Sequence, residues 1–332
     1  MRGLRTAALV GALLLTGLGA PRAEVSEVRI TRQPSIVYLP LVVMQEAKLL
    51  EKHAAAAGLG TVKATWTTLN SGGAGVDALL AGNIDLVSSG CSNLILLWDR
   101  TKGEVKGVAG ASAIPMVIVT RNPNVKTIKD FSEKDRIAVP TLKVSMQATA
   151  LRLAAEQAFG DAGRDRLDPL TVQLGHPDAT AAVLSPNHEV NSHFSLPPYL
   201  SQELADPRVH KVLDSADVVG GPLSNGVVFG TRKFHDANPK TMAAFLAGLE
   251  EAVQIIKSDP RRAAELYLTS TKEKFTVDEL TAMITAPGVV YATTPYNTEK
   301  VADLFFRSNM IKTKPKSWKE YFFPEVHELP GT

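Results

Sequence analysis

The sequence has little cysteine and few aromatic residues. Of its 332 residues, one is a cysteine, Cys91, and 6% are aromatic, whereas 45% are hydrophobic. A single cysteine cannot form an intramolecular disulfide. Because a lone cysteine among small and apolar neighbours usually packs as a small hydrophobic residue, we expect a packing role for Cys91 rather than catalysis or metal binding.

The chain also lacks an excess of charge of either sign. Its 36 Lys and Arg residues stand against 34 Asp and Glu residues, so the formal net charge is +2. Without a basic field, the electrostatic attraction that holds a nucleic-acid backbone is missing. We therefore expect no nucleic-acid partner.

No apolar run after residue 23 approaches the ~20 residues that span a bilayer. At the N-terminus, Arg2 and Arg5 precede a shorter apolar run, residues 7–18, and small residues follow it around Ala20 and Ala23. This order is typical of a secretory signal peptide. We predict a signal peptide at residues 1–23 and export of the mature chain to the periplasm.

Motifs of common catalytic sites are missing as well. The sequence contains no Gly-x-Ser-x-Gly, His-Glu-x-x-His or Cys-x-x-Cys. The glycines of residues 72–75 lack the Lys-Ser/Thr of a phosphate loop and the spacing of a dinucleotide fingerprint. His188 and His193 are the closest pair of histidines, and a solvated loop is their simpler interpretation than a metal site. We predict no enzymatic activity, no cofactor and no metal.

The residues that are present alternate between strand and helix patterns. Expected strands and helices alternate over residues 24–111, and a second series of this kind covers residues 136–213. After a further strand at 227–229, the pattern is almost wholly helical, with prolines at the helix starts Pro239 and Pro260. The sequence predicts an α/β fold with mostly parallel sheets.

Two extended crossings, near residues 111–120 and 218–230, connect the two series. We expect residues 24–113 and 225–332 to form one lobe and residues 114–224 to form the other. The helical C-terminal segment is expected to pack on the first lobe. Clefts between lobes of this kind often bind small ligands and close by a hinge motion.

Two polar turns in the first lobe each follow a strand and open a helix. They are Asn70-Ser71-Gly72-Gly73-Ala74-Gly75 and Ser88-Ser89-Gly90-Cys91-Ser92-Asn93. Ser and Gly suit positions where backbone N–H groups lack partners, and ligands of open α/β sheets bind at such strand ends. Alone, each turn is equally compatible with an ordinary helix cap. Paired with residues 142–147 across a hinge, they indicate the two halves of a ligand clamp.

Four segments carry a family resemblance: YLPLVVMQEAKLLEK from Tyr38, VDALLAGNIDL from Val76, VKTIKDF from Val125 with RIAV at 136–139, and NPKTMAAF from Asn238. In this order they resemble the substrate-binding proteins of ABC importers, in the nitrate/sulfonate/taurine family, over essentially the whole mature chain. The resemblance implies a type II periplasmic-binding-protein fold with two lobes and two hinge crossings. It also implies a monomer that delivers a small-molecule ligand to ABC importer permease subunits in the inner membrane.

The resemblance also implies which residues line the cleft. Carried over by position, they are Ser35, Ile36, Tyr38, Asn70, Ser71, Gly72, Ser89, Gly90, Cys91, Lys143, Ser145, Met146 and Gln147. Where many relatives have an acidic or Trp-bearing strand end, this chain has neither at 190–199. There we expect Phe194 or Tyr199 to stack on the ligand and His193 to donate a hydrogen bond. A purely structural role for His193 is the alternative.

The predicted ligand is a small organic anion, a sulfonate or a carboxylate. Apolar residues such as Ile36, Met146, Phe194 and Pro197 offer walls for a carbon skeleton, which nitrate would not need. A neutral heterocycle similar to a thiamine precursor is one alternative. An enzyme on the same fold, similar to the thiamine-pyrimidine synthases, is another, but those synthases carry a cysteine-rich motif that a chain with one cysteine cannot supply.

Overall fold

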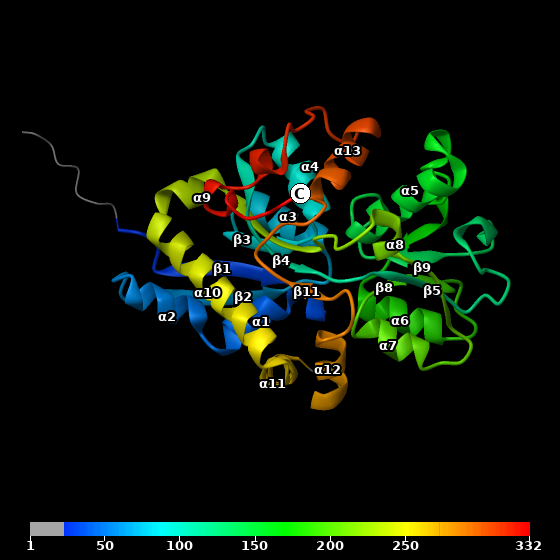
Figure 1. Ribbon diagram of the computed structural model, residues 1–332, viewed down its shortest axis with the longest axis horizontal. Helices are drawn as coiled ribbons and strands as arrows, with labels where there is room; N and C mark the ends of the chain where they lie inside the picture. Colours follow the sequence, from blue (N-terminus) through cyan, green and yellow to red (C-terminus); the bar gives the residue numbers. More distant parts are fainter. Residues whose placement is uncertain (1–22, 272) are drawn as a thin grey trace, which may run out of the picture.

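The computed structural model describes residues 23–271 and 273–332, so residues 1–22 of the expected signal peptide lie outside the described chain. Two sheets lie side by side, each with helices against it (Figure 1). This is the expected two-lobed α/β arrangement. Within the described ranges, no helix is long and apolar enough to cross a membrane.

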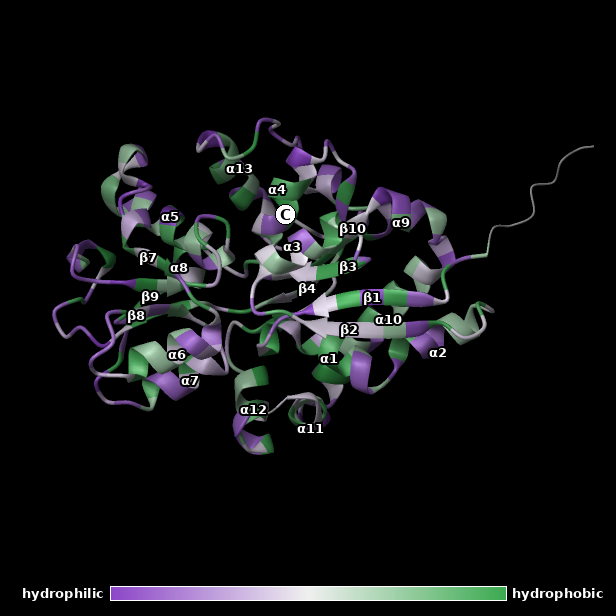
Figure 2. Ribbon diagram, turned by 180° about the vertical axis from the view of Figure 1, so that it is seen from behind, coloured by the Kyte–Doolittle hydropathy of each residue, from purple (hydrophilic) through white to green (hydrophobic). Residues whose placement is uncertain are grey.

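The first sheet has the strand order β11-β4-β10-β3-β1-β2. Its strands are β1 (Glu27–Arg32), β2 (Lys63–Thr68), β3 (Leu86–Ser89), β4 (Val105–Ala113), β10 (Gly226–Thr231) and β11 (Val290–Tyr291). β1 runs parallel to both β2 and β3, whereas β10 enters between β3 and β4 and is antiparallel to both. In Figure 2, β10 is mainly hydrophobic, as a strand buried between two helical layers should be.

The second sheet repeats this plan with the order β7-β6-β8-β5-β9. Its strands are β5 (Val117–Thr120), β6 (Ile137–Val139), β7 (Thr171–Gln173), β8 (Ser192–Ser195) and β9 (His210–Asp214). β6 is parallel to β7 and β8, and β5 is antiparallel to β8 and β9. Each sheet therefore receives one antiparallel strand from a crossing, β5 from the first and β10 from the second. The lobe boundaries at residues 113 and 225 stay a prediction.

The helices follow the strands closely in the two βα series. The first series has α1 (Leu39–Glu46), α2 (Leu49–Ala56), α3 (Gly72–Leu80) and α4 (Cys91–Arg100), and the second has α5 (Met146–Phe159), α6 (His176–Leu184), α7 (Tyr199–Leu204) and α8 (Ser215–Val219). The C-terminal segment adds α9 (Arg232–Ala237), α10 (Pro239–Ser258), α11 (Pro260–Ser270), α12 (Val277–Ile284) and α13 (Thr298–Arg307).

Several boundaries differ from those expected. The spacing of apolar residues predicts one helix from Leu39 to His53, but the structure has two, because Lys48 has a left-handed backbone (φ 51°) that ends α1 and starts α2. The sequence predicts a short helix that starts at Asp77, but α3 begins at Gly72, because the Ser71 side chain caps it. The short elements α8, α9 and β11 were not expected, because segments of this length are too short to show a hydrophobic period.

The C-terminal segment packs on the first sheet through α10, whose buried face contains Met242, Phe245 and Leu249. It also contacts the second half of the chain. The Arg307 guanidinium of α13 pairs with the Glu156 carboxylate of α5 at 2.6 Å. Lys300 of the same helix donates to the Val219 carbonyl. The last helix therefore bridges the two sheets, beyond the expected contact with the first.

The two crossings are tied together by one side chain. Asn225 donates to the Ile114 carbonyl oxygen at 2.7 Å and accepts from the Ile114 backbone N–H at 3.1 Å. Both residues are buried. Because one amide satisfies both backbone groups of Ile114, the two extended segments are fixed to each other at this point.

Gly110 of β4 offers a test of this packing. A Cβ atom there would lie 2.6 Å from the Thr294 carbonyl oxygen, which is backbone and cannot move aside. Gly110→Ala should therefore lower the free energy of unfolding by about 1–3 kcal/mol, measured by urea denaturation. Gly73→Ala is the control, because its Cβ meets nothing closer than 3.6 Å. Equal stability of both variants would place the segment around Thr294 away from β4.

Candidate functional site

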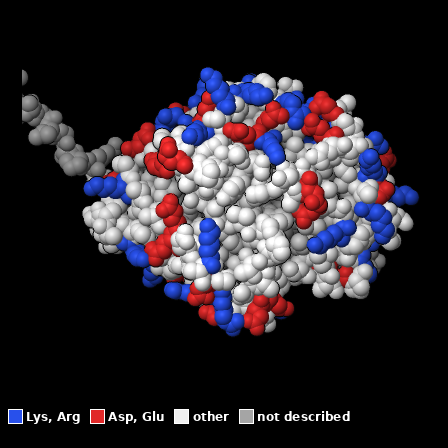
Figure 3. All heavy atoms as spheres, viewed as in Figure 1, with Lys and Arg blue, Asp and Glu red and all other residues white. Residues whose placement is uncertain are grey.

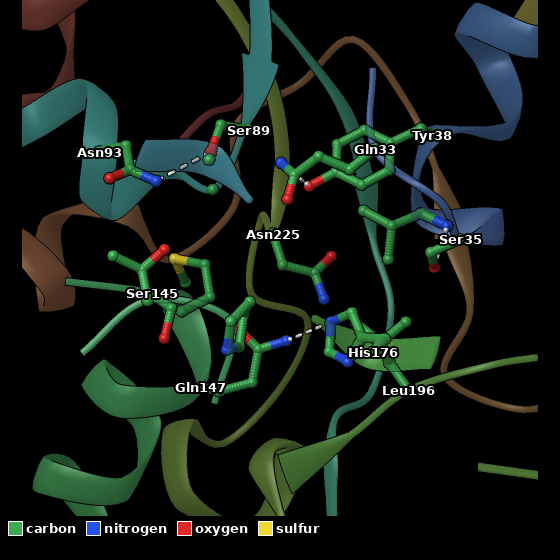
Figure 4. Close-up of a pocket in the computed structure, with 16 residues that line it drawn as sticks. Gln33, Ser35, Tyr38, Ser89, Asn93, Ser145, Gln147, His176, Leu196 and Asn225 are labelled. Carbon is green, nitrogen blue, oxygen red and sulfur yellow. Dashed lines mark hydrogen bonds between the residues drawn. The ribbon is translucent and has the colours of Figure 1, made fainter. Parts of the chain in front are cut away.

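A small cavity lies between the two sheets (Figure 4). Its volume is about 30 Å³, room for one or two water molecules. Loops and helix starts of both halves line it: Gln33, Ser35, Val37, Tyr38, Gly72, Ser89, Gly90, Asn93, Pro140, Thr141, Ser145, Met146, Gln147, His176, Leu196 and Asn225. The set contains no Lys, Arg, Asp or Glu. On the face of the molecule shown in Figure 3, charged side chains of both signs are mixed.

Four helices begin at this cavity. Gly72 is the first residue of α3, Gly90 is the N-cap of α4, Ser145 is the N-cap of α5 and His176 is the first residue of α6. The first N–H groups of a helix have no partner within it, and the aligned peptide dipoles give that end a partial positive charge. The cavity therefore has a positive potential without a single cationic side chain.

Three hydroxyl groups of the wall have a free proton to donate. The oxygens of Tyr38, Ser89 and Ser145 accept hydrogen bonds from Gln33 Nε2 (2.7 Å), Asn93 Nδ2 (2.8 Å) and the Ala148 N–H (3.2 Å). None of the three donates to an acceptor among the described residues. Burial raises the pKa of Tyr38, so its phenol keeps the proton. These groups suit a ligand with acceptor atoms.

Two glycines allow the wall to close. A Cβ at Gly72 would lie 2.0 Å from Ser89 Oγ and 2.4 Å from Asn93 Nδ2. A Cβ at Gly90 would lie 2.3 Å from Met146 Cγ. Either side chain would therefore collide with a group that forms the cavity, which explains small residues at both helix starts.

Met146 of α5 reaches across to the start of α4. Its Sδ atom lies 3.4 Å from the Ser92 backbone nitrogen, which donates to it, and 3.6 Å from Cys91 Sγ. On the other side of the cavity, Ser35 Oγ donates to the Pro197 carbonyl oxygen at 2.9 Å. The two halves of the chain are thus in direct contact around the cavity, as in a closed cleft.

A line of hydrogen bonds leads away from the cavity into the second sheet. Gln147 Nε2 lies 3.3 Å from His176 Nε2 (Figure 4), and His176 Nδ1 lies 2.8 Å from His193 Nε2. His193 Nδ1 in turn lies 2.6 Å from Glu203 Oε1. All four side chains are buried. Burial, together with the neighbouring His193, holds the pKa of His176 well below its ordinary value.

The structure brings eight of the residues expected to contact ligand to the cavity wall. They are Ser35, Tyr38, Gly72, Ser89, Gly90, Ser145, Met146 and Gln147. The sequence also predicts an N-cap at Ser145, and the structure confirms it, since the Ser145 hydroxyl accepts from the Ala148 N–H. Ligand contact by these residues stays a prediction.

Seven expected residues lie elsewhere. Ile36 and Phe194 are fully buried in the hydrophobic core, and Cys91 is buried against Met146. His193 lies one ring behind His176. Three more residues, Asn70, Ser71 and Lys143, belong to the adjoining turns but not to the wall. Tyr199 stacks on the His176 ring, with the ring centroids 5.7 Å apart. His176 therefore covers the face of the Tyr199 ring that was expected to stack on the ligand.

The wall contains eight residues that the sequence reasoning missed: Gln33, Val37, Asn93, Pro140, Thr141, His176, Leu196 and Asn225. His176 could have been found, because it opens a helix directly after a strand, as Ser145 does. Asn225 carried no signal in the sequence, since its position depends on how the second crossing meets the first.

Comparison with known proteins agrees with the fold. The model of the NMT1-like family matches residues 21–268. Among curated proteins, no match to the sequence was found. The expected nitrate/sulfonate/taurine resemblance is confirmed by the family match and by the solved structures that follow.

Three solved structures illustrate the likeness. The alkanesulfonate-binding protein of Xanthomonas axonopodis pv. citri, bound to MOPS, is 18% identical with a TM-score of 0.70, covering 88% of this chain and 96% of its own. The periplasmic aliphatic sulphonate binding protein of Escherichia coli is 22% identical with a TM-score of 0.64, covering 88% and 95%. The periplasmic nitrate-binding protein of Synechocystis PCC 6803 is 15% identical with a TM-score of 0.60, covering 78% and 70%. The chain has the periplasmic-binding-protein fold that was expected.

The contact of Gly90 with Met146 predicts a variant that cannot close. Gly90→Ala should force Met146 away from α4, because its Cβ would lie 2.3 Å from Met146 Cγ. Small-angle X-ray scattering should then show a larger radius of gyration than for the unmodified protein. The double variant Gly90→Ala/Met146→Ala should restore the original value, because it removes the collision. An unchanged radius for the single variant would contradict the contact.

Proposed function

The chain belongs to the NMT1-like family, and we propose that it is a periplasmic solute-binding protein that captures a small organic anion and delivers it to an ABC importer. Two similar proteins are described as binding sulfonates and a third as binding nitrate. The ligand we propose for this chain is a sulfonate or a carboxylate. We propose that the chain is a monomer and that this ligand binds between its two lobes.

The observation that carries this proposal is the excess of donors at the cavity. The starts of α3, α4, α5 and α6 meet three hydroxyl groups with free protons, and no carboxylate lies in the wall. Such an arrangement stabilises the oxygens of an anionic group, and it is unfavourable for a cation. A sulfonate or carboxylate head group suits it because several oxygens can accept at once.

Apolar residues in the same wall support an organic ligand. Val37, Met146 and Leu196 line the cavity beside the donors. With a volume of about 30 Å³, the cavity is too small for a carbon skeleton. The lobes must therefore open to admit such a ligand and close around it less tightly than here. The tie between Asn225 and Ile114 is the natural pivot for that motion.

A neutral heterocycle is the second candidate. It is favoured by the absence of Lys and Arg from the wall and by the low pKa of His176, which leaves no formal positive charge at the cavity. Helix starts bind neutral acceptors too, but with less energy than they bind anions. Thermal-shift screening with both classes of ligand separates the two candidates.

The ligand class is tested by thermal-shift screening with alkanesulfonates, aromatic carboxylates and thiamine precursors. A ligand at ~100 times its dissociation constant adds about 2.7 kcal/mol, which raises the melting temperature by ~4 °C in a chain of this size. We expect this shift with sulfonates or carboxylates. Stabilisation by thiamine precursors alone would sink the organic-anion proposal, and turnover of any bound compound would show an enzyme instead.

The site is tested by Ser145→Ala. This variant removes a hydroxyl donor from the cavity, and a hydrogen bond to a charged ligand contributes ~1.5–3 kcal/mol, so the dissociation constant should rise about 10- to 100-fold. The control is Thr276→Ala, which removes an equivalent N-cap from α12. Calorimetric titration should show normal binding by the control. Equal affinities of the two variants would contradict the assigned site.

A further inference from the structure

The buried chain of side chains behind the cavity has a feature that anion binding alone does not require. It ends on a carboxylate. Glu203 Oε1 accepts from Thr180 Oγ1 at 3.0 Å and from His193 Nδ1 at 2.6 Å, and Glu203 is fully buried. Its other oxygen, Oε2, has no partner among the described residues. A buried carboxyl group thus lies two imidazole rings from the cavity where we propose that an anion binds.

The geometry fixes the direction of the hydrogen bonds when both rings are neutral. His193 donates through Nδ1 to Glu203, so its Nε2 must accept from His176 Nδ1. The Nε2 of His176 then carries a lone pair, to which the Gln147 amide donates. In this state the histidine at the cavity wall is an acceptor, which is unfavourable beside the oxygens of an anion.

One additional proton reverses the end of the chain. If the two rings together gain a proton, His193 still donates to Glu203 and one proton remains shared between His176 Nδ1 and His193 Nε2. The Nε2 of His176 must then carry a hydrogen and becomes a donor at the wall, and the Gln147 amide must turn so that its NH2 group no longer faces this atom. The positive charge also neutralises Glu203 within the same chain. Because the rings share one hydrogen bond, the proton belongs to the pair rather than to either histidine.

Few other titratable groups face this pair. Tyr199 of α7 stacks on His176, and its hydroxyl donates to Glu273 at 3.1 Å. Burial raises the pKa of Tyr199, so it stays uncharged. Asp178, also on α6, is exposed. From the opposite side, Gln147 of α5 presents a neutral amide. Glu203 is therefore the charge that the pair senses most directly.

We propose that the Glu203–His193–His176 chain couples the binding of an anion to the uptake of one proton from solvent. This inference rests on the function proposed above. An anion in the cavity adds a second negative charge to that of Glu203, and like charges in a buried site favour protonation between them. In the free protein, burial and the neighbouring His193 hold the pKa of His176 well below its ordinary value, so the ring at the wall is neutral at neutral pH and the proposed proton enters together with the ligand.

The sign of the pH dependence follows from linkage. A complex that holds one more proton than the free components loses affinity as pH rises, by a factor of about 10 for each pH unit. The dissociation constant should therefore increase about 100-fold between about pH 6 and about pH 8 for a ligand that stays an anion throughout. Alkanesulfonates meet that condition, since their own protonation lies far below this range.

The experiment is calorimetric titration with the alkanesulfonate that gives the largest thermal shift. It is carried out near neutral pH in Tris and in Bis-Tris, two buffers that contain no sulfonate and differ in ionisation enthalpy. The difference between the two apparent binding enthalpies, divided by the difference between the ionisation enthalpies of the two buffers, gives the number of protons taken up. We expect a value near one. Proton uptake of zero with the same affinity at both ends of the pH range would overturn the coupling while leaving the proposed function intact.

Two variants separate a positioning role of the chain from a merely structural one. Glu203→Gln and His193→Gln should each abolish proton uptake and flatten the pH profile. His53→Gln is the control, because the His53 ring contacts Glu251 and is not part of the cavity wall or of the chain behind it. Retained proton uptake in both folded variants would overturn the proposal. If no anion of the panel binds the unmodified protein at any pH, the proposed function fails and the coupling fails with it.

Discussion

Backbone N–H groups at the start of a helix must find a partner outside the helix, and four helices of this protein begin at one cavity. This requirement decides much of the surrounding sequence. Glycine at positions 72 and 90 lets neighbouring groups approach to distances that no Cβ would allow. Serine at 145 satisfies one N–H and leaves its own proton free. The two sheets meet where their helices need acceptors, which the ligand proposed above would supply.

The cavity obtains its positive potential from peptide dipoles rather than from Lys or Arg. Dipoles fixed by whole helices need no reorganisation when a ligand arrives, and they do not bring long flexible side chains that must be ordered. They also leave the site without a formal charge. The acidic side chain nearest the wall along the hydrogen-bonded chain is then that of Glu203. Electrostatic behaviour at this site is therefore set as much by what lies behind the wall as by the wall itself.

Much of the fold could be predicted, because Pro and Gly mark the helix ends and hydrophobic periodicity marks the strands. Pro239 and Pro260 begin α10 and α11 as expected. The left-handed Lys48 could not be foreseen, since nothing in its identity favours that backbone over a continuing helix. Within the site, the polar turns that directly follow a strand could be predicted from the sequence. Neighbouring side chains of a strand point to opposite faces of the sheet, so Phe194 and His193 of β8 lie on different faces. Which of the two faces α6 depends on the sheet register, which the sequence does not reveal.

Glu203, His193 and His176 lie on three different elements, α7, β8 and α6, and no spacing in the sequence links them. Their meeting depends on tertiary packing, as does the tie between the crossings.

The tie between Asn225 and Ile114 has a geometric consequence. If one sheet rotates relative to the other, points close to Asn225 move through short arcs and points far from it through long ones. Asn225 itself lines the cavity, so its vicinity keeps nearly the same shape in both positions. A pair of spectroscopic distance labels placed outside the cavity wall, one on each half, would therefore report the rotation better than a label at Asn225.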